Sequence, residues 1–163
     1  MIRIVYTLLV ILLSTSVSPS LAKEPFFGTV KKNIDGDSLV IYSGKKRIEV
    51  RLYGVDCPEY KQPFSNEAKA FAGKIVYGKK VLVRPEYYDS YKRLVAIVEY
   101  RGQTLNSELV RAGLAWVYPK FCRKKICNSW MQMEESAKME KKGIWSTPYS
   151  IPPWKWKRIK HGN

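Results

Sequence analysis

Three short β-type runs follow one another between residues 28 and 55, with only turn residues between them. The third run alternates strictly: Ile48, Val50 and Leu52 share one side, and charged or aromatic residues share the other. Asp-Gly and Ser-Gly pairs stand between the runs, as is typical of tight turns. This arrangement predicts strands that pair with their neighbours in a sheet or a small barrel.

Two further strands and three helices are predicted after these runs. Helices are expected at residues 64–76, 105–112 and 129–143, and strands at residues 79–84 and 92–100. With one helix between the third and fourth strands, this order predicts an α+β, mainly β fold, namely a five-stranded OB-fold-type barrel with three α-helices. An open α+β sandwich is the structural alternative.

The two ends of the chain differ from this central domain. Residues 1–22 have a positive start, an apolar stretch and a small-residue site ending at Ala22, which together predict a secretory signal peptide. An uncleaved N-terminal anchor is the alternative. The domain is expected to span residues 23–146 of a secreted or periplasmic monomer that has no stable membrane association after signal removal. Residues 147–163 are basic and rich in tryptophan and lysine, and are predicted to form an extended tail.

Cysteine and histidine usage limits the chemistry. Cys122 and Cys127 are five positions apart, and we favour a disulfide between them over two free thiols. Cys57 is then a packed, reduced residue, because no histidine lies near it in the sequence to activate it. The single histidine, His161, argues against Ser-His-Asp catalysis and multi-histidine metal sites.

Positive charge exceeds negative charge by a wide margin. The chain has 29 Lys and Arg against 14 Asp and Glu, which gives a formal net charge of +15. A polyanion is the natural partner, since each neutralised phosphate releases condensed counterions. Tyrosines and tryptophans near the basic clusters are suited to stacking on unpaired bases. Charge alone does not separate nucleic acid from acidic polysaccharide or an anionic membrane.

The acidic residues that occur in so basic a chain form the candidate site. Asp37 and Asp56 offer hard carboxylate oxygens of the kind that Ca²⁺ or Mg²⁺ prefers. Glu59 is suited to taking a proton from water, and Arg51 and Arg93 present planar forks that match phosphate oxygens. Hydrolysis of a phosphodiester needs these parts: an activated water, a positioned phosphate and relief of the developing negative charge.

These residues lie in ordered motifs, followed by a matching helical segment, at residues 34–38, 51–59, 89–93 and 105–115. In these motifs the chain closely resembles the staphylococcal-nuclease-like (thermonuclease, micrococcal nuclease) family, and the resemblance runs from about Gly28 to Trp145. The resemblance implies a five-stranded OB-type barrel with three helices. It also implies Ca²⁺-dependent hydrolysis of DNA and RNA that leaves 3′-phosphate ends.

The resemblance further implies roles for individual residues. By position, Asp37, Asp56 and the backbone carbonyl of Cys57 are calcium ligands, and Glu59 is the general base. Arg51 is a catalytic contact to the phosphate and the transition state, as is the second arginine of the motif.

Substrate contacts follow from the same resemblance. Tyr91 matches a nucleotide-contacting tyrosine, and Asp89 and Tyr118 are further substrate-binding candidates around the second arginine, Arg93. Lys92 departs from the family pattern, which has a glycine before this arginine. A nuclease-like domain that binds nucleic acid without cutting it is the alternative function, and a secreted cationic adhesion protein is a third.

Overall fold

The computed structural model describes residues 24–161, so the predicted signal peptide lies outside the described residues. Within this part, no helix is long and apolar enough to span a bilayer. Its strands are β1 (Phe26–Asn33), β2 (Ser38–Ser43), β3 (Lys46–Leu52), β4 (Val55–Asp56), β5 (Lys80–Tyr88), β6 (Leu94–Tyr100), β7 (Gln103–Thr104) and β8 (Trp116–Val117). Its helices are α1 (Ser65–Val76), α2 (Leu105–Arg111), α3 (Ile126–Met139), the 3₁₀ turn η1 (Gly143–Ser146) and α4 (Pro153–His161).

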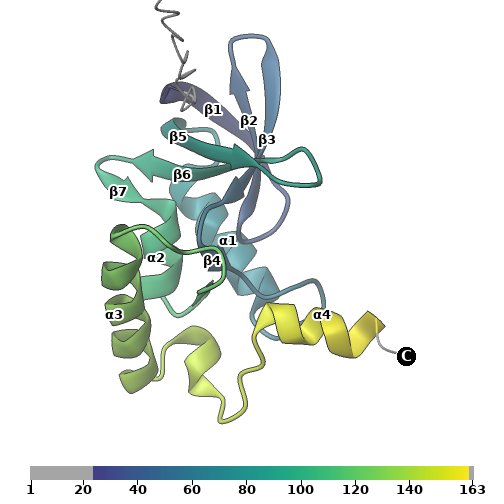
Figure 1. The fold of residues 1–163 in the computed structure, drawn as a ribbon, viewed down its shortest axis with the longest axis vertical. Coiled ribbons are helices and arrows are strands. Elements are labelled where there is room, and N and C mark those ends of the chain that lie inside the picture. The colour runs from purple at the N-terminus through teal and green to yellow at the C-terminus, as the bar shows by residue number, and fades with distance from the viewer. Residues whose placement is uncertain (1–23, 162–163) are drawn as a thin grey trace, which may run out of the picture.

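Five long strands close into the barrel that the sequence predicts (Figure 1). β1 pairs with β2 and β5, β2 pairs with β3, and β5 pairs with β6, all in antiparallel register. A parallel pairing of β3 with β6, with Val50 opposite Leu94 and Leu52 opposite Ala96, joins the two ends of the sheet. The short β7 extends the sheet at β6, and β4 pairs with β8 in a separate ladder.

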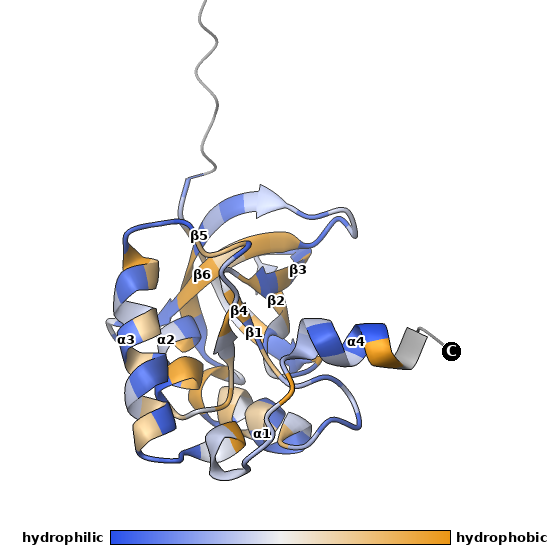
Figure 2. Cartoon of the chain, turned by 60° about the horizontal axis from the view of Figure 1, so that its bottom comes forward, coloured by the Kyte–Doolittle hydropathy of each residue, from blue (hydrophilic) through white to orange (hydrophobic). Residues whose placement is uncertain are grey.

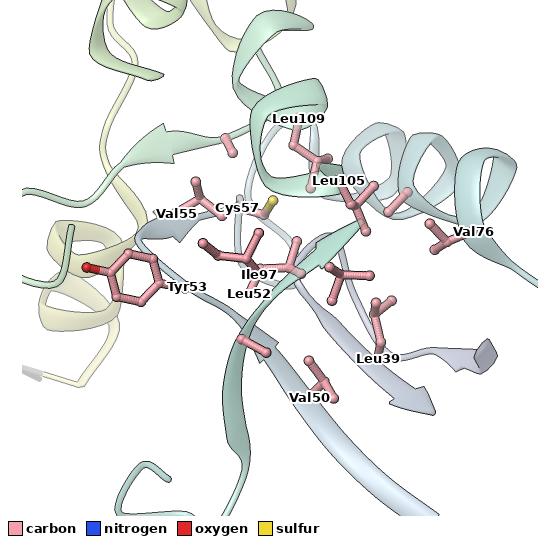
Figure 3. Packing of buried hydrophobic residues seen from close by; sticks show 14 of the residues in the cluster. Leu39, Val50, Leu52, Tyr53, Val55, Cys57, Val76, Ile97, Leu105 and Leu109 are labelled. Carbon is pink, nitrogen blue, oxygen red and sulfur yellow. The ribbon is translucent and has the colours of Figure 1, made fainter. Parts of the chain in front are cut away.

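The core of the barrel continues into the layer formed by α1 and α2 (Figure 3). Leu39 and Val50 on the strands are fully buried, and Val76 of α1 and Leu109 of α2 complete the same cluster. The buried residues of α1 recur every four positions, so one stripe of the helix faces the strands. In contrast to α1, helix α4 is hydrophilic along most of its length, as Figure 2 shows.

Several predicted element boundaries are wrong, including the end of α3, which is Met139 and not residue 143. α3 begins at Ile126 and not at Ser129, because the Ser129 hydroxyl donates to the Ile126 carbonyl within the helix instead of capping it. β5 continues beyond its expected end at residue 84, because a register shift between Pro85 and Tyr87 lets the strand bend and keep its pairing with β6.

The C-terminal region is helical, which corrects the predicted extended tail. The three helices expected from the sequence are present as α1, α2 and α3, and α4 is an additional one. Pro153 occupies the first helical position, where a fixed φ and a missing amide hydrogen are tolerated. The amides of Lys155 and Trp156 both donate to the Pro152 carbonyl, and Pro153 is buried. The prolines therefore start this helix and do not prevent it.

The Cys122–Cys127 disulfide favoured by the spacing is present, with Cα atoms 5.7 Å apart, and Cys57 is buried with a free thiol. The bridge packs on the turn between β3 and β4. A Cβ at Gly54 would lie 2.5 Å from the Cys122 sulfur, and Gly54 has a φ of +69°, so both space and conformation require glycine there. The Gly54 carbonyl accepts the Tyr118 amide at 2.8 Å, which ties this loop to the barrel.

The inaccessible side chain of Asn106 provides a test of the packing around the barrel. Its Nδ2 donates to the Tyr53 carbonyl at 2.9 Å, and its Oδ1 accepts the Val98 amide at 3.2 Å. We expect Asn106→Ala to lower the free energy of unfolding by about 3 kcal/mol, because two buried backbone groups lose their partner. Asn66→Ala, at an exposed position of α1, should change it by less than about 0.5 kcal/mol. Urea denaturation measures both, and equal small losses would contradict the expectation.

Candidate active site

An arginine and two aspartates from different parts of the chain meet at one point. Arg51 lies on β3, Asp37 ends the turn before β2, and Asp56 ends β4. The Arg51 guanidinium contacts Asp37 Oδ2 at 3.0 Å and Asp56 Oδ1 at 2.6 Å. It also donates to the Val55 carbonyl at 2.9 Å. Arg51 therefore has a fixed orientation, and its two acidic partners are held close together.

Backbone contacts explain why these turns come together. The Cys57 amide donates to Asp37 Oδ2 at 2.6 Å, and the Leu52 amide donates to the Asp37 carbonyl at 2.8 Å. Gly36 permits this approach, because a Cβ there would lie 2.8 Å from the side chain of Cys57. The Asp-Gly-Asp sequence is therefore more than a turn signal: its glycine lets two loops touch, and its second aspartate bonds them together.

Burial dominates the electrostatics of this cluster. It raises the pKa of Asp37 from 3.8 to about 8, although the attraction of Arg51 opposes the shift. Burial also raises the pKa of Asp56, again against the attraction of Arg51. The pKa of the Cys57 thiol is raised by burial as well, so this thiol is not an activated nucleophile. One buried guanidinium faces two buried carboxyl groups, and such an arrangement favours a further cation.

The second arginine is held by the turn between β5 and β6. Both Nε and one terminal nitrogen of Arg93 lie 2.8 Å from Asp89 Oδ2. Asp89 Oδ1 accepts the amides of Tyr91 and Arg93 at 3.0 and 2.9 Å. Partial burial raises the pKa of Asp89, but the hydrogen bonds from Arg93 and Tyr91 outweigh it and lower the pKa overall. Asp89 therefore organises the turn and directs Arg93.

Lys92 adopts the conformation that a glycine would have at its position. Its φ is +62°, in the left-handed region that non-glycine residues rarely occupy. Its amide donates to the Asp89 carbonyl at 3.0 Å, which closes the turn. The departure from the family pattern at Lys92 thus leaves the contact between Arg93 and Asp89 intact.

A cavity of about 220 Å³ opens between the two arginines. Most of the site residues predicted from the sequence line it: Arg51, Asp56, Asp89, Tyr91, Arg93 and Tyr118. Asp37 and Cys57 do not line the cavity but are buried beside it. Asp37 Oδ2 contacts the Arg51 guanidinium and accepts the Cys57 amide. Glu59 does not line the cavity itself, but it lies next to a residue that does. Its Oε1 is 2.8 Å from Nζ of Lys157, which lines the cavity.

Seven of the lining residues are absent from the predicted site, and two of them, Tyr87 and Lys157, have polar side chains. Tyr87 reaches the cavity because β5 bends after Pro85, and no local signal in the sequence shows which way the ring then points. Lys157 reaches it from α4, whose Trp154 ring stacks on the Tyr118 ring with centroids 4.5 Å apart and planes 8° apart. The position of this lysine depends on tertiary docking that the sequence pattern does not indicate.

Asp37 and Asp56 fit a hard divalent cation by their donor chemistry. Arg51 makes its short contacts with Oδ2 of Asp37 and Oδ1 of Asp56, so the second oxygen of each acid lies outside these contacts. Among residues 24–161, no three acidic, cysteine or histidine side chains gather in a group that could hold a metal. A cation here would need backbone oxygens and water to complete its coordination.

Comparison with known proteins agrees with this geometry. The chain is a small closed barrel of five strands, with a two-arginine cavity beside paired aspartates. Residues 49–147 match the family model described as Staphylococcal nuclease homologue, and the chain belongs to this family.

Individual relatives are similar over most of the chain. An uncharacterized endonuclease of Haemophilus influenzae is 34% identical over 149 residues, which cover 91% of this chain and 82% of that protein. A micrococcal nuclease of Shigella flexneri is 31% identical over 142 residues, covering 82% of this chain and 81% of that protein. The staphylococcal-like nuclease CAN1 of Arabidopsis thaliana is 34% identical over 119 residues, which are 72% of this chain but 35% of that protein. These relatives support, at the level of the family, a nuclease that hydrolyses nucleic acid.

Replacing Arg51 with glutamine tests the buried cluster. The change leaves two buried carboxyl groups without their cation, so we expect the free energy of unfolding to fall by about 3 kcal/mol or more at neutral pH. The raised pKa values of Asp37 and Asp56 should rise further without Arg51. The loss should be smallest where both acids are protonated in the folded protein, and it should grow as the pH rises through their raised folded pKa values, about 8 for Asp37.

Arg84→Gln is the matched control. This arginine is exposed, and its terminal nitrogen lies 3.1 Å from Glu99 Oε2. Its loss should cost less than about 1 kcal/mol at every pH. Urea denaturation at several pH values compares the two variants, and a similar, pH-independent loss for both would refute the account of the buried cluster.

Proposed function

We propose that the protein is an exported, calcium-dependent endonuclease that cuts DNA and RNA and leaves 3′-phosphate ends. The observation that carries the proposal is the convergence of Arg51 and Arg93 on one cavity beside Asp56. A phosphodiester carries its negative charge on oxygens that planar guanidinium groups match in geometry. Membership of a family of nuclease homologues supports the same class of substrate.

The two arginines are proposed to stabilise the phosphate as negative charge develops on it. Asp37 and Asp56 hold Arg51 from two sides, and Asp89 holds Arg93 through two nitrogens. Donors that are already oriented need little reorganisation in the transition state, which is the main advantage of such a site. The same bonds leave further N–H groups of each guanidinium for the substrate.

Glu59 is the proposed general base. Its side chain is 33% exposed at the edge of the cavity, where water has access to it. In the proposed reaction Glu59 takes a proton from water, and the resulting hydroxide oxygen bonds to phosphorus. The bond from phosphorus to the 5′ oxygen breaks, and that oxygen accepts a proton from solvent, to which Glu59 returns its own, and leaves as a hydroxyl. The phosphate remains on the 3′ side of the cut.

Calcium is proposed to bind at Asp37, Asp56 and the backbone carbonyl of Cys57. These are oxygen donors, as Ca²⁺ requires, and an ion bound there would compensate the negative charge that burial makes unfavourable on the two aspartates. The chemistry that the ion supplies when bound is polarisation of a phosphate oxygen and compensation of its charge. Tyr91, which is 80% exposed beside Arg93, and Tyr118 are proposed to contact the nucleotide.

Export is proposed from the sequence of residues 1–22. Cleavage after Ala22 would give a monomeric chain that begins at Lys23, acts outside the cytoplasm and has no stable membrane association. The intact mass of the protein recovered from the periplasm or medium checks this expectation. A mass equal to that of the full chain would contradict signal cleavage.

The reaction is tested with the chain from residue 23 onwards and end-labelled single-stranded DNA and RNA, in Ca²⁺, in Mg²⁺ and in chelator. We expect cleavage in Ca²⁺, none in chelator, and products that end in a 3′-phosphate. Glu59→Gln should lower kcat by about 10²- to 10⁴-fold, because the variant cannot accept the proton from water. Glu135→Gln, on a side chain of α3 that is 65% exposed, should leave kcat unchanged.

Each negative outcome has a separate meaning. Retarded but uncut DNA in Ca²⁺ would support the alternative, a nuclease-like domain that binds nucleic acid without hydrolysing it. Cleavage that persists in Glu59→Gln would retain the nuclease and remove Glu59 as its base. Cleavage in chelator would remove the proposed cofactor.

A further inference from the structure

We propose that Lys157 of α4 is a third phosphate-binding cation of this site and contacts the backbone of the bound strand. The proposal rests on the proposed nuclease function and extends it to a helix beyond residue 147, where the match to the family model ends. Figure 1 shows this helix running outward from the body of the domain.

The start of α4 is docked by specific contacts. The Trp154 ring lies parallel to the Tyr118 ring, with 4.5 Å between centroids. Gln62 Nε2 donates to the Ile151 carbonyl at 2.6 Å, and Gln62 Oε1 accepts the Glu59 amide at 2.9 Å. One buried glutamine therefore joins the segment before α4 to the loop that carries Glu59, and the helix has a defined place beside the cavity.

This docking brings Lys157 into the cavity. Residues three apart lie on the same face of a helix, so the stacking of Trp154 turns Lys157 toward the same side. Its Nζ lies 2.8 Å from Glu59 Oε1, and its side chain lines the cavity together with Arg51 and Arg93. Three cations from three separate parts of the chain thus line one cavity of about 220 Å³.

The ion pair between Lys157 and Glu59 is suited to exchange. The lysine side chain is 51% exposed and the glutamate 33%, and exposed pairs of this kind contribute little stability. The lysine stem is flexible and its ammonium acts as a point charge, so it can turn from a carboxylate to a phosphate within the same cavity. Binding of the strand would then leave Glu59 free to act on water.

The rest of α4 has the charge that such a role needs. Its sequence has no acidic residue, and Lys155 and Arg158 are both exposed. No side chain of this helix therefore repels a phosphodiester bound at Lys157. The contact between Lys157 and Glu59 could instead act as a latch that blocks Glu59. The experiment below separates this latch from substrate binding by Lys157.

Binding of a labelled single-stranded DNA in chelator, followed by fluorescence anisotropy at several salt concentrations, measures the contact without cleavage. We expect Lys157→Met to raise Kd about fivefold and to reduce the slope of log Kd against log salt by about 0.7. Lys157→Arg should retain most of the affinity. Lys155→Met makes the same charge change on the same helix outside the cavity, and should have a clearly smaller effect on Kd.

Kinetics in Ca²⁺ complete the test. We expect Lys157→Met to raise KM with kcat within about twofold of wild type, as for a residue that binds substrate uniformly. Equal Kd changes in Lys157→Met and Lys155→Met would overturn the proposal, because the effect would then be nonspecific charge. Unchanged Kd with a higher kcat would also overturn it and identify a latch. If the wild-type protein cuts nothing, the nuclease proposal fails, and the anisotropy comparison still decides the role of Lys157.

Discussion

The contact of Arg51 with Asp37 and Asp56 is the interaction on which the rest of the site depends. Taking one guanidinium and two carboxyl groups out of water is costly, and only close, well-oriented hydrogen bonds offset that cost. Those bonds draw together the turn before β2, the strand β3 and the end of β4, and the Cys57 amide completes the joint. Burial raises the pKa of both aspartates even beside Arg51, so the cluster favours a further positive charge.

The elements around this cluster differ in whether they lie within the residues that match the family model. Arg51, Asp56, β5 and β6 lie within residues 49–147, which match the family model, whereas Asp37, β1 and β2 precede them. The loop that carries Phe121 and the Cys122–Cys127 bridge packs on the turn after β3 and borders the cavity from one side. Helix α4 borders it through Lys157, outside the matched part. Elements that border the cavity thus lie both inside and outside the part of the chain that matches the family model.

Local patterns predict most of the fold and the centre of the site, because both depend on short-range rules. Strict alternation in the third run placed Arg51 on a strand, and the rarity of acids in a basic chain drew attention to Asp37 and Asp56. The fourth helix could not be predicted in this way: two prolines and several lysines are typical of a tail, and only the docking of Trp154 on Tyr118 gives them a structured setting. Lys92 shows the same limit, since its left-handed conformation is set by the hydrogen bonds of Asp89 and not by its own preference.

The parallel pairing of β3 with β6 has a consequence for when the protein becomes capable of acting. Arg51 stands opposite Val95 in that pairing, and Arg93 lies just before β6, so the two arginines come together only when distant parts of the chain have joined. Such long-range pairings form late, because they close large loops before any contact rewards them. A chain in which β3 and β6 have not paired therefore lacks the cavity between the two arginines. The two-arginine site is therefore complete only after the barrel has closed.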